Sequence, residues 1–508
     1  MTTLSDLLLH GRSVPDHRPW PRTVIDDAIW ELLAQHLIDG RLTLMGLWGD
    51  RPPDAAPMVH FALLDEGSGD IGIASLECPE GRFPSLGCLH PPAILLERAV
   101  RDLFGLEPSG LADPRPWLDH GRWSVKHPLG PCAESRDAVP YAFLPAEGNS
   151  LHQVAVGPVH AGTIEPGHFR FTVNGETVVR LEVRLGYAHK GIEGLMAGAD
   201  IARCARLAGH TSGDSTVAYA LAFARAVEAA LGVDVPPRAV WLRALMAELE
   251  RLANHLGDIG AVCNDASFAL MHAQCGILRE RTLRLAAACF GHRLMMDRVV
   301  PGGVASDIDA AGIDAVREYV GDIRRTLPAL VSLYDNTASL QDRTVGAGIL
   351  RADLARTFGC GGYVGRASGR GFDARRTLRY APYDQLRFDV PVLQEGDVNA
   401  RVWIRVREVE QSLALAEQIL AQLPSGTLCA EIAPRPDQRA EGLAVVEGFR
   451  GDILIWARIK GTTVERCHLR DPSWFQWPLI EAAIEGNIVA DFPLCNKSFN
   501  CSYSGHDL

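Results

Sequence analysis

The sequence predicts an α+β protein in which a small α/β N-terminal domain precedes a large, mainly helical domain with sheet at its edges. A chain of 508 residues exceeds what one hydrophobic core usually organises, so two domains are expected. Four prolines between residues 121 and 150 interrupt regular structure and mark a connector. From Ile192 onward the pattern changes to long amphipathic stretches. We therefore predict domains at 1–120 and 151–508, joined by the connector 121–150.

The first 120 residues mix short helical and strand-like segments. Residues 25–37 have a helical pattern, and the apolar runs 42–47 and 59–64 have the length of strands. Short mixed elements of this kind are typical of a small domain in which helices cover a sheet.

The second domain opens with strands and continues with helices. The segment 168–187 contains Asn174-Gly175 between alternating apolar residues, which predicts a β-hairpin. Long helices are predicted at 217–231, 236–256, 267–292, 313–334 and 402–423.

Composition and charge exclude several classes of function. The net charge of −12 and the absence of a dense Lys/Arg block argue against nucleic acid as a partner. The N-terminus lacks the basic and apolar segments of a secretory signal, and no apolar run is long enough to cross a bilayer. Twelve cysteines in such a chain are expected to be reduced thiols. We expect a cytoplasmic protein.

The segment from Glu97 to Leu118, ERAVRDLFGLEPSGLADPRPWL, suggests a first family resemblance. Local rules alone give a helix end, a turn at Gly105 and an Asp-Pro loop. The order of a Glu-Arg pair, Asp-x-Phe-Gly and Asp-x-Arg resembles the signature of the 30-kDa subunit of respiratory complex I. This resemblance implies a docking and structural element, so we expect its charges to be ion-paired.

The second domain resembles the 49-kDa subunit of complex I and the large subunit of formate hydrogenlyase over nearly its whole length. The matching stretches lie, in family order, at 157–171, 184–195, 247–260, 366–376, 383–391 and in the C-terminal tail. The hydrogenlyase subunit has the same fused N-terminal domain. The sequence is thus identified as a member of the family shared by complex I and membrane-bound [NiFe] hydrogenases.

The resemblance raises the question of a metal centre. A [NiFe] site needs four thiolates from two Cys-x-x-Cys pairs, because soft sulfur ligands hold nickel and bridge the iron. The family pattern places these ligands at Ala208, Thr211, Ser502 and Gly505, and none of the four is cysteine. We expect this chain to bind no nickel.

Cysteines near the C-terminus leave two interpretations open. Cys495 and Cys501 are expected to be buried thiols, because free cysteine is among the most buried residue types. The alternative is a degenerate metal site formed by Cys495, Cys501 and His506, although this spacing matches neither a zinc ribbon nor an iron–sulfur motif.

A quinone pocket is the alternative to a metal centre within this family. In the complex I branch, the resemblance implies a histidine and a tyrosine that donate protons to a reduced quinone. The histidine aligns with His168, and the tyrosine position holds Gly209, with His210 beside it. We therefore consider His168 and His210 as candidate quinone-binding residues and His168 equally as a structural residue.

Other candidates follow from the same alignment. Glu165 matches an acidic proton-relay position and could equally be a solvated hairpin charge. Arg450 matches an arginine that points into the active-site cavity of the family. Asp373 and Arg375 match an Asp-x-Arg pair that is expected to be structural first and proton-handling second, because removal of one partner leaves a buried charge.

Two functions remain in competition at this stage. The first is a peripheral-arm subunit on the inner face of the cell membrane that couples electron transfer to a membrane arm. It would dock an iron–sulfur small subunit, which carries the cluster, and antiporter-like membrane subunits. The second is a non-catalytic scaffold with the same interfaces. A free-standing NAD-dependent dehydrogenase is disfavoured, because no Gly-x-Gly-x-x-Gly follows a strand. Any link to NAD would involve other subunits.

Overall fold

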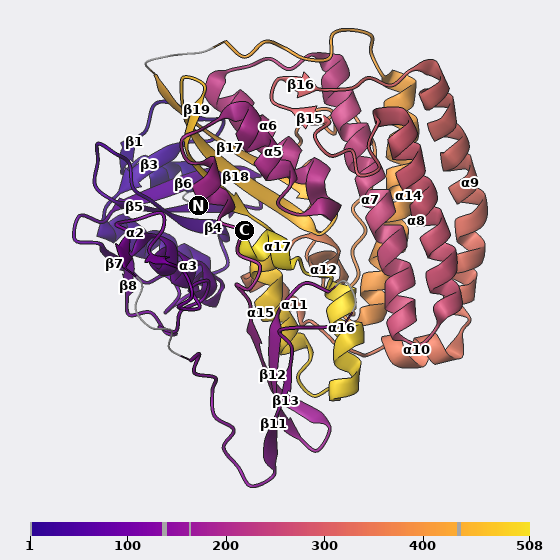
Figure 1. Cartoon of the computed structure of the whole chain (residues 1–508), viewed down its shortest axis with the longest axis horizontal. Helices are drawn as coiled ribbons and strands as arrows, with labels where there is room; N and C mark the ends of the chain where they lie inside the picture. Colours follow the sequence, from indigo (N-terminus) through magenta and orange to yellow (C-terminus); the bar gives the residue numbers. More distant parts are fainter. Residues whose placement is uncertain (1–2, 135–139, 162–163, 434–437) are drawn as a thin grey trace.

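The N-terminal part of the computed structural model is an α/β domain built on a five-stranded sheet (Figure 1). The structure describes residues 3–134, 140–161, 164–433 and 438–508. In sheet order, the strands are β1 (Arg12–Ser13), β3 (Arg22–Ile25), β6 (Asp70–Glu77), β5 (Met58–Asp65) and β4 (Thr43–Asp50). The helices are α1 (Leu4–Leu8), α2 (Asp27–Ile38) and α3 (Ile94–Phe104), and the small pair β7 (Arg82–Pro84) and β8 (Glu107–Ser109) completes the domain. The helix and the two strands predicted here are confirmed.

The charges of the 97–118 segment hold its own loop in place. The Glu97 carboxylate accepts hydrogen bonds from the Leu86 and Gly87 amides at 2.6 and 3.1 Å, and Arg98 pairs with Asp113 at 2.9 Å. Asp102 accepts bonds from the amides of residues 117–119. Arg98 and Asp113 are therefore ion-paired, as expected from the resemblance, whereas Glu97 and Asp102 are held by backbone amides.

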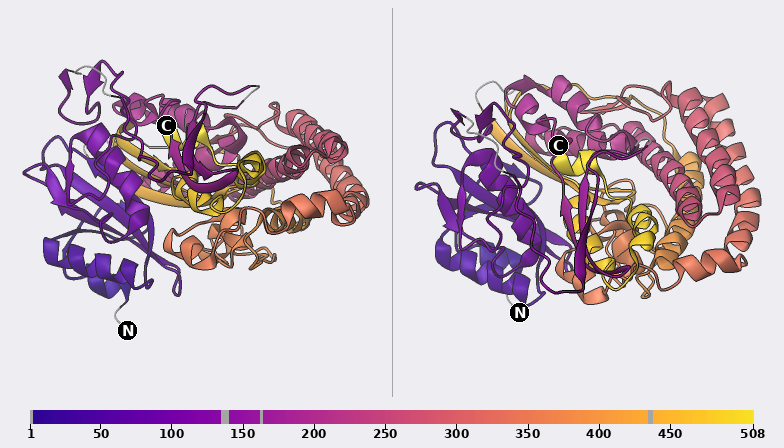
Figure 2. Two further views of the ribbon diagram at one scale, coloured as in Figure 1. Left: turned by 90° about the horizontal axis from the view of Figure 1, so that it is seen from below. Right: turned by 60° about the horizontal axis from the view of Figure 1, so that its bottom comes forward.

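Long helices form the far end of the molecule, and Figure 2 shows them opposite the N-terminal domain. The five predicted helices are confirmed as α6 (Thr216–Leu231), α7 (Pro237–Asp265), α8 (Ala269–Phe290), α9 (Ala310–Asp335) and α14 (Val398–Gln422). Helix α7 begins after Pro236 with Pro237 in its first turn, where the missing amide donor costs nothing. The shorter helices are α4 (Ile192–Met196), α5 (Ile201–Gly209), α10 (Ala338–Thr344), α11 (Ala352–Thr357), α12 (Gly362–Ala367) and α13 (Ala374–Thr377).

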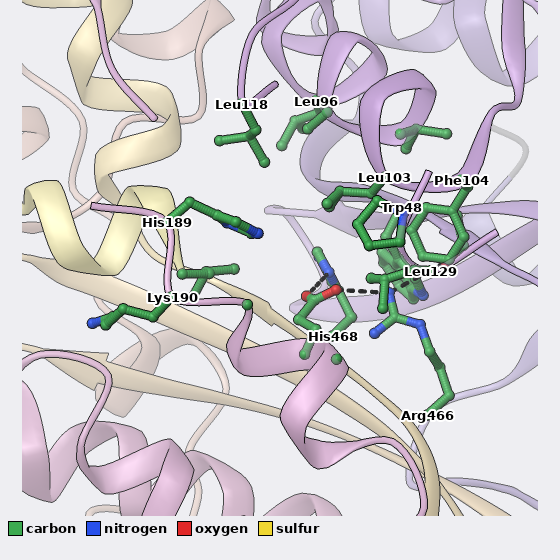
Figure 3. A pocket seen from close by; sticks show the side chains of 18 of the residues that line it. Trp48, Leu96, Leu103, Phe104, Leu118, Leu129, His189, Lys190, Arg466 and His468 are labelled. Carbon is green, nitrogen blue, oxygen red and sulfur yellow. Dashed lines mark hydrogen bonds and ion pairs between the residues drawn. The ribbon is translucent and has the colours of Figure 1, made fainter. Parts of the chain in front are cut away.

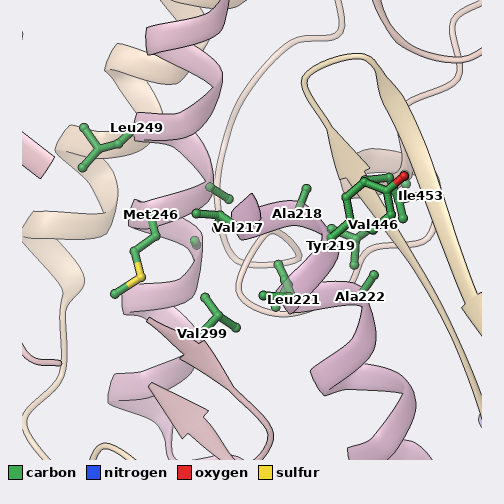
Figure 4. Close-up of a cluster of buried hydrophobic side chains, with 14 of the residues drawn as sticks. Val217, Ala218, Tyr219, Leu221, Ala222, Met246, Leu249, Val299, Val446 and Ile453 are labelled. Carbon is green, nitrogen blue, oxygen red and sulfur yellow. The ribbon is translucent and has the colours of Figure 1, made fainter. Parts of the chain in front are cut away.

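A second five-stranded sheet lies between the N-terminal domain and the long helices (Figure 1). Its order is β14 (Ala199–Asp200), β19 (Thr463–Arg470), β18 (Gly451–Lys460), β17 (Arg439–Gly448) and β2 (His17–Arg18). Helix α6 covers it, with Tyr219 next to Val446 and Ile453 (Figure 4). Strand β2, from the N-terminal region, pairs parallel with β17. The two predicted domains therefore share one sheet.

A three-stranded antiparallel sheet projects beside the C-terminal helices (Figure 1). It consists of β11 (Leu151–Val156), β12 (His168–Asn174) and β13 (Thr177–Arg184), and the predicted turn at Asn174-Gly175 joins the last two. Helices α15 (Ser473–Ala483), α16 (Phe492–Phe499) and α17 (Tyr503–Asp507) pack next to it. The remaining two-residue strands are β9 (Val125–Lys126), β10 (Ala133–Glu134), β15 (Val299–Val300) and β16 (Gly303–Val304).

No helix among the described residues is long and apolar enough to cross a membrane.

Candidate functional site

The candidate site is a cavity of about 430 Å³ where the β11–β12 loop meets the C-terminal tail. Its walls come from the sheet at Val156 and Phe169, from the 212–214 turn and from α16 and α17. The predicted residues Glu165, Arg450 and Ser502 all line it. Segments that lie far apart in the sequence thus form one cavity.

Arg450 provides the positive charge at the cavity wall. Its guanidinium donates two hydrogen bonds to the Asp214 carboxylate, at 2.8 and 2.5 Å, and a third to the Asn500 carbonyl at 2.5 Å. Burial alone would raise the pKa of Asp214, but the charge of Arg450 and the hydrogen bonds from Arg450, Ser212 and Ser215 together outweigh it and lower this pKa to about 2. The pair therefore stays ionised, and Asp214 is the partner that keeps partial access to the cavity, with 35% of its side chain exposed.

A group of hydrogen-bonded side chains occupies the region of the expected metal ligands. We call Tyr219, Asp471, Ser473 and Ser502 the polar plug. The Tyr219 hydroxyl donates to Asp471 at 2.6 Å, the Ser473 amide donates to the same carboxylate at 2.8 Å, and the Ser502 amide donates to the Ser473 hydroxyl at 2.8 Å. These short, buried bonds satisfy the Asp471 carboxylate without a metal ion.

Gly505 shows why the plug excludes a metal ligand. A Cβ atom at this position would lie 2.4 Å from Asp471 Oδ2 and 2.8 Å from Ser502 Oγ. Any side chain at 505, cysteine included, would have to displace the carboxylate. The residues present do not fit a [NiFe] centre, on steric grounds as well as on ligand type.

The other two expected ligand positions are filled by packing. Ala208 is fully buried on α5, and the Thr211 hydroxyl donates to the Leu207 carbonyl at 3.2 Å. The neighbouring Ser212 Oγ lies 3.4 Å from Ser502 Oγ, so the two ligand-bearing segments of the family do meet here. Their contact is between hydroxyl groups instead of thiolates.

Cys495, Cys501 and His506, the residues of the alternative metal site, are not grouped as metal ligands in the described structure. Cys495 and Cys501 are buried, and burial raises the pKa of both thiols, that of Cys495 to about 11. His506 is bonded at both ring nitrogens, to the Asp507 carboxylate at 2.9 Å and to the Trp117 indole at 3.2 Å. Within the described part of the chain, no group of three or more His, Cys, Asp or Glu residues is arranged to hold a metal ion.

Two of the predicted quinone ligands lie away from the cavity. His168 begins β12 and bonds the Gly157 carbonyl at 3.1 Å and Arg170 at 3.3 Å. Because side chains alternate along a strand, the next residue, Phe169, faces the cavity instead. His210 lies at the end of α5, 46% exposed, and contacts Asp297 at 3.1 Å. Gly209, at the tyrosine position, is buried inside α5.

His160 and Tyr503 line the cavity, although sequence reasoning did not select them as site residues. His160 Nε2 bonds the Gly167 carbonyl at 2.7 Å. Among the described residues, the Tyr503 hydroxyl is buried without a hydrogen-bond partner of good geometry, and burial raises its pKa well above the usual value. A histidine and a tyrosine therefore do reach this cavity, from positions other than those given by the alignment. A histidine in a Gly-Pro-x-His loop was the one local signal for His160.

Glu165 and Lys497 add opposite charges at the rim. Glu165 Oε2 accepts a 3.4 Å bond from the Ser504 amide, and Lys497 Nζ lies 3.8 Å from Asp258. Asp258 also accepts two 3.0 Å bonds from the Asn500 side chain. The rim thus has an acid and a base that are held only by long contacts.

Asp373 and Arg375 belong to a different place, a buried cluster in the helical layer. We call Glu248, Arg366, Asp373, Arg375, Glu408 and Glu447 the buried ionic network. Arg375 bonds Asp373 at 2.7 Å and Glu248 at 2.9 Å, and Arg366 bonds Glu408 and Glu447. All six are at most 2% exposed. None of them lines the cavity, and their charges are paired with one another.

A separate apolar cavity of about 310 Å³ lies between the N-terminal sheet and β19 (Figure 3). Its charged wall is internally paired, because Glu193 bonds both Arg466 and His468 at 2.8 Å. Trp48 stacks on His468 with ring centroids 4.8 Å apart. Two further titratable side chains of this wall, His189 and Lys190, bond the Asp507 and Thr211 carbonyls at 2.7 Å.

The comparisons with known proteins agree with this architecture. Residues 269–441 match the family model of the respiratory-chain NADH dehydrogenase 49 Kd subunit, and residues 44–134 match that of the 30 Kd subunit. Formate hydrogenlyase subunit 5 of Escherichia coli (strain K12) is 32% identical over 84% of this chain and 77% of its own length. Hydrogenase-4 component G of the same organism is 31% identical over 95% of this chain and 86% of its own length.

Two further similarities link the chain to respiratory complexes. An NADH-quinone oxidoreductase subunit of Desulfotalea psychrophila is 32% identical over 66% of this chain and 91% of its own length. A chain from the structure of the membrane-bound sulfane sulfur reductase, an archaeal respiratory membrane complex, superposes with a TM-score of 0.67 at 26% identity. The match covers 71% of this chain and 99% of that one.

The fold and the site together define a class of protein, a two-module subunit whose helical domain closes a cavity with its C-terminal tail. The chain belongs to the family of the respiratory-chain NADH dehydrogenase 49-kDa subunit and related hydrogenase components, with the 30-kDa-type domain in front.

Proposed function

We propose that this chain is a peripheral-arm subunit of a membrane-associated redox complex of the complex I and hydrogenlyase type, and that it works without a [NiFe] centre. The proposal that no [NiFe] centre is present rests on the contact at Gly505, where Asp471 occupies the space of a ligand side chain. The family membership supports the first half of the proposal. The proposed partners are an iron–sulfur small subunit and antiporter-like membrane subunits on the inner face of the cell membrane.

We further propose that the cavity takes a quinone head group as substrate. Reduction of a quinone needs proton donors within hydrogen-bond reach of its oxygens. His160 and Tyr503 are groups of suitable chemistry in the wall, and no described residue bonds the Tyr503 hydroxyl with good geometry, so it can accept or donate a bond to a ligand. The Arg450–Asp214 pair would fix the polar end of the cavity.

A scaffold role is the second candidate, and one observation favours it. The positive and negative charges at the cavity wall, Arg450 and Asp214, are already paired with one another, and the family tyrosine position holds Gly209. A subunit with these features would still bind its partner subunits but would catalyse no reaction.

The test is made on the intact complex, purified from its source membranes. Metal analysis should give iron and no stoichiometric nickel, and the complex should reduce a soluble quinone analogue. Tyr503→Phe should lower quinone turnover by about a hundredfold, as for loss of a general acid. Tyr187→Phe, at an exposed tyrosine outside the cavity wall, is the matched control.

Three outcomes decide between the proposals. Stoichiometric nickel would contradict the metal assignment. Normal turnover in Tyr503→Phe would show that this residue donates no proton in the reaction. A complex that assembles fully and reduces no acceptor at all would establish the scaffold role.

A further inference from the structure

A third cavity, of about 670 Å³, is lined by the later turns of α6, the first turns of α7 and residues 380–383. Its polar wall contains Arg18, Arg225, Glu228, Arg243, Tyr380 and Tyr383. Its apolar wall comes from Leu221 on α6, from Val233 and Val235 between the helices and from Val240 at the start of α7. The cavity shares no lining residue with the candidate site, and the proposed function does not involve it.

Arg225 is the unusual residue of this wall. It lies in the middle of α6, and its Nε atom is buried without a hydrogen-bond partner. Among the residues that the structure describes, its guanidinium forms no ion pair, and its contact is the face of the Tyr380 ring, 4.6 Å from the ring centroid. The five-donor fork of this side chain is therefore unused.

Arg243 gives the internal comparison, because it lines the same cavity and is fully satisfied. It forms a two-point contact with Glu228 at 3.0 and 2.5 Å and also donates to the carbonyls of Gly303 and Val300. Glu228 additionally accepts from the Gly302 amide at 2.7 Å. The carboxylate closest in sequence to Arg225 is thus already committed.

An unpaired guanidinium in a half-buried wall is costly unless an anion completes it. Burial also lowers the pKa of Arg225, because removal from water disfavours the charged guanidinium. A carboxylate matches the planar fork of arginine with two parallel hydrogen bonds. The cavity beside Arg225 provides the room for such a group.

The charges of the wall favour a single negative charge on the ligand. Three arginines, Arg18, Arg225 and Arg243, face two carboxylates, Glu228 and Asp234, which leaves a net charge of +1. A dianion such as phosphate would leave one negative charge unbalanced in the cavity, and its desolvation costs more than that of a monoanion. The apolar side of the wall favours a ligand that carries a hydrocarbon body.

We propose that this cavity binds a small monocarboxylate with an apolar body, and that Arg225 holds the carboxylate group. The Tyr380 ring packs against the face of the guanidinium. Leu221 and the lining valines cover the hydrocarbon part of the ligand.

The test uses the purified full-length chain and hexanoate as the probe, followed by titration calorimetry near pH 7. Hexanoate should bind, whereas 1-hexanol, the neutral counterpart of equal length, and inorganic phosphate should bind at least about tenfold more weakly. Arg225→Gln should weaken hexanoate binding by a similar factor. Arg376→Gln, at an exposed arginine outside the cavity, is the control and should bind as the wild type does.

A second measurement needs no variant. Hexanoate should protect Arg225 of the wild-type chain from an arginine-selective dicarbonyl reagent, read by peptide mass spectrometry, while Arg376 reacts at an unchanged rate. Equal binding of hexanol and hexanoate would overturn the carboxylate assignment, and stronger binding of phosphate would do the same. Unchanged reactivity of Arg225 in saturating hexanoate would overturn its assignment as the binding residue.

Discussion

Two groups of charges lie inside this chain, and they differ in what they leave open. In the buried ionic network, Arg366 contacts Glu408 at 2.7 Å, Glu447 at 2.9 Å and Asp373 at 3.6 Å, and no side chain of the group is accessible. In the candidate cavity, Asp214 pairs with Arg450 but keeps 35% of its side chain exposed. The first arrangement can only hold helices together. The second can exchange a hydrogen bond with a ligand.

The comparison teaches that charge alone does not mark a functional residue in this fold. Asp373 and Glu165 both follow from the same family alignment, yet one is sealed among arginines and the other lies at a cavity rim. Buried ion pairs without access to solvent affect the free energy of unfolding and do not contact a ligand. Variants of the buried ionic network should therefore lower the free energy of unfolding, whereas variants of the cavity wall should mainly lower turnover.

The largest effect is expected at the centre of the network. Arg366→Met leaves the Glu408, Glu447 and Asp373 carboxylates without their shared cation, so the free energy of unfolding should fall by about 3–5 kcal/mol. Chemical denaturation measures this. Arg324→Met, which breaks the exposed pair with Glu417, should cost at most about 1 kcal/mol. Equal losses in the two variants would contradict the distinction.

The polar plug should show the next largest effect. Gly505→Ala places a Cβ atom 2.4 Å from Asp471 Oδ2, so we expect a loss of about 1–3 kcal/mol from overpacking. Gly276→Ala is the matched control, because this helical glycine of α8 has open space around its Cβ direction. It should stabilise the chain by about 0.5–1 kcal/mol. A stable Gly505→Cys variant that binds nickel would refute the steric argument.

The helices were predictable because their apolar residues recur with the helical period, and α6, α7, α8, α9 and α14 end within a few residues of the predicted bounds, except for the C-terminal end of α7. The central strands β17 and β18 were not. They are buried on both faces, so their residues form continuous apolar runs without the alternation that identifies a strand.

The candidate site was predictable only in part, for a related reason. Arg450, Glu165 and Ser502 reach the cavity as the alignment implied. His168 does not, because its position on β12 is one residue out of phase with the cavity-facing side of the strand. Tyr503 comes to His160 through the packing of α17 against the β11–β12 loop, a long-range contact that no local pattern encodes.

A second carboxylate near the cavity, that of Glu250, should make the stability of the chain depend on pH. Glu250 accepts bonds from the Val217 and Ala218 amides at the start of α6, and burial raises its pKa to about 8. The folded state therefore retains a proton that the unfolded state loses near its ordinary pKa. Between about pH 4.5 and pH 8, this group should reduce the free energy of unfolding as the pH rises, by at most about 1.4 kcal/mol per unit.

Glu250→Gln removes this titration, so its stability should change less steeply with pH than that of the wild type over the same range. Denaturant unfolding at intervals of half a pH unit provides the comparison. Parallel curves for the two proteins would show that Glu250 is ionised in the folded state.

The smallest effect is expected at His210, which the family alignment placed beside the tyrosine position. Its ring is 46% exposed and contacts Asp297, itself 43% exposed, and neither residue lines the cavity. His210→Gln should change the free energy of unfolding by less than about 0.5 kcal/mol, as for an isolated surface pair. Quinone turnover of the complex should stay within about twofold of the wild type, because this ring is not in the cavity wall and cannot donate a proton directly to a bound quinone. A large loss of turnover with unchanged stability would return His210 to the candidate site and would mean that the cavity opens toward α5 in the assembled complex.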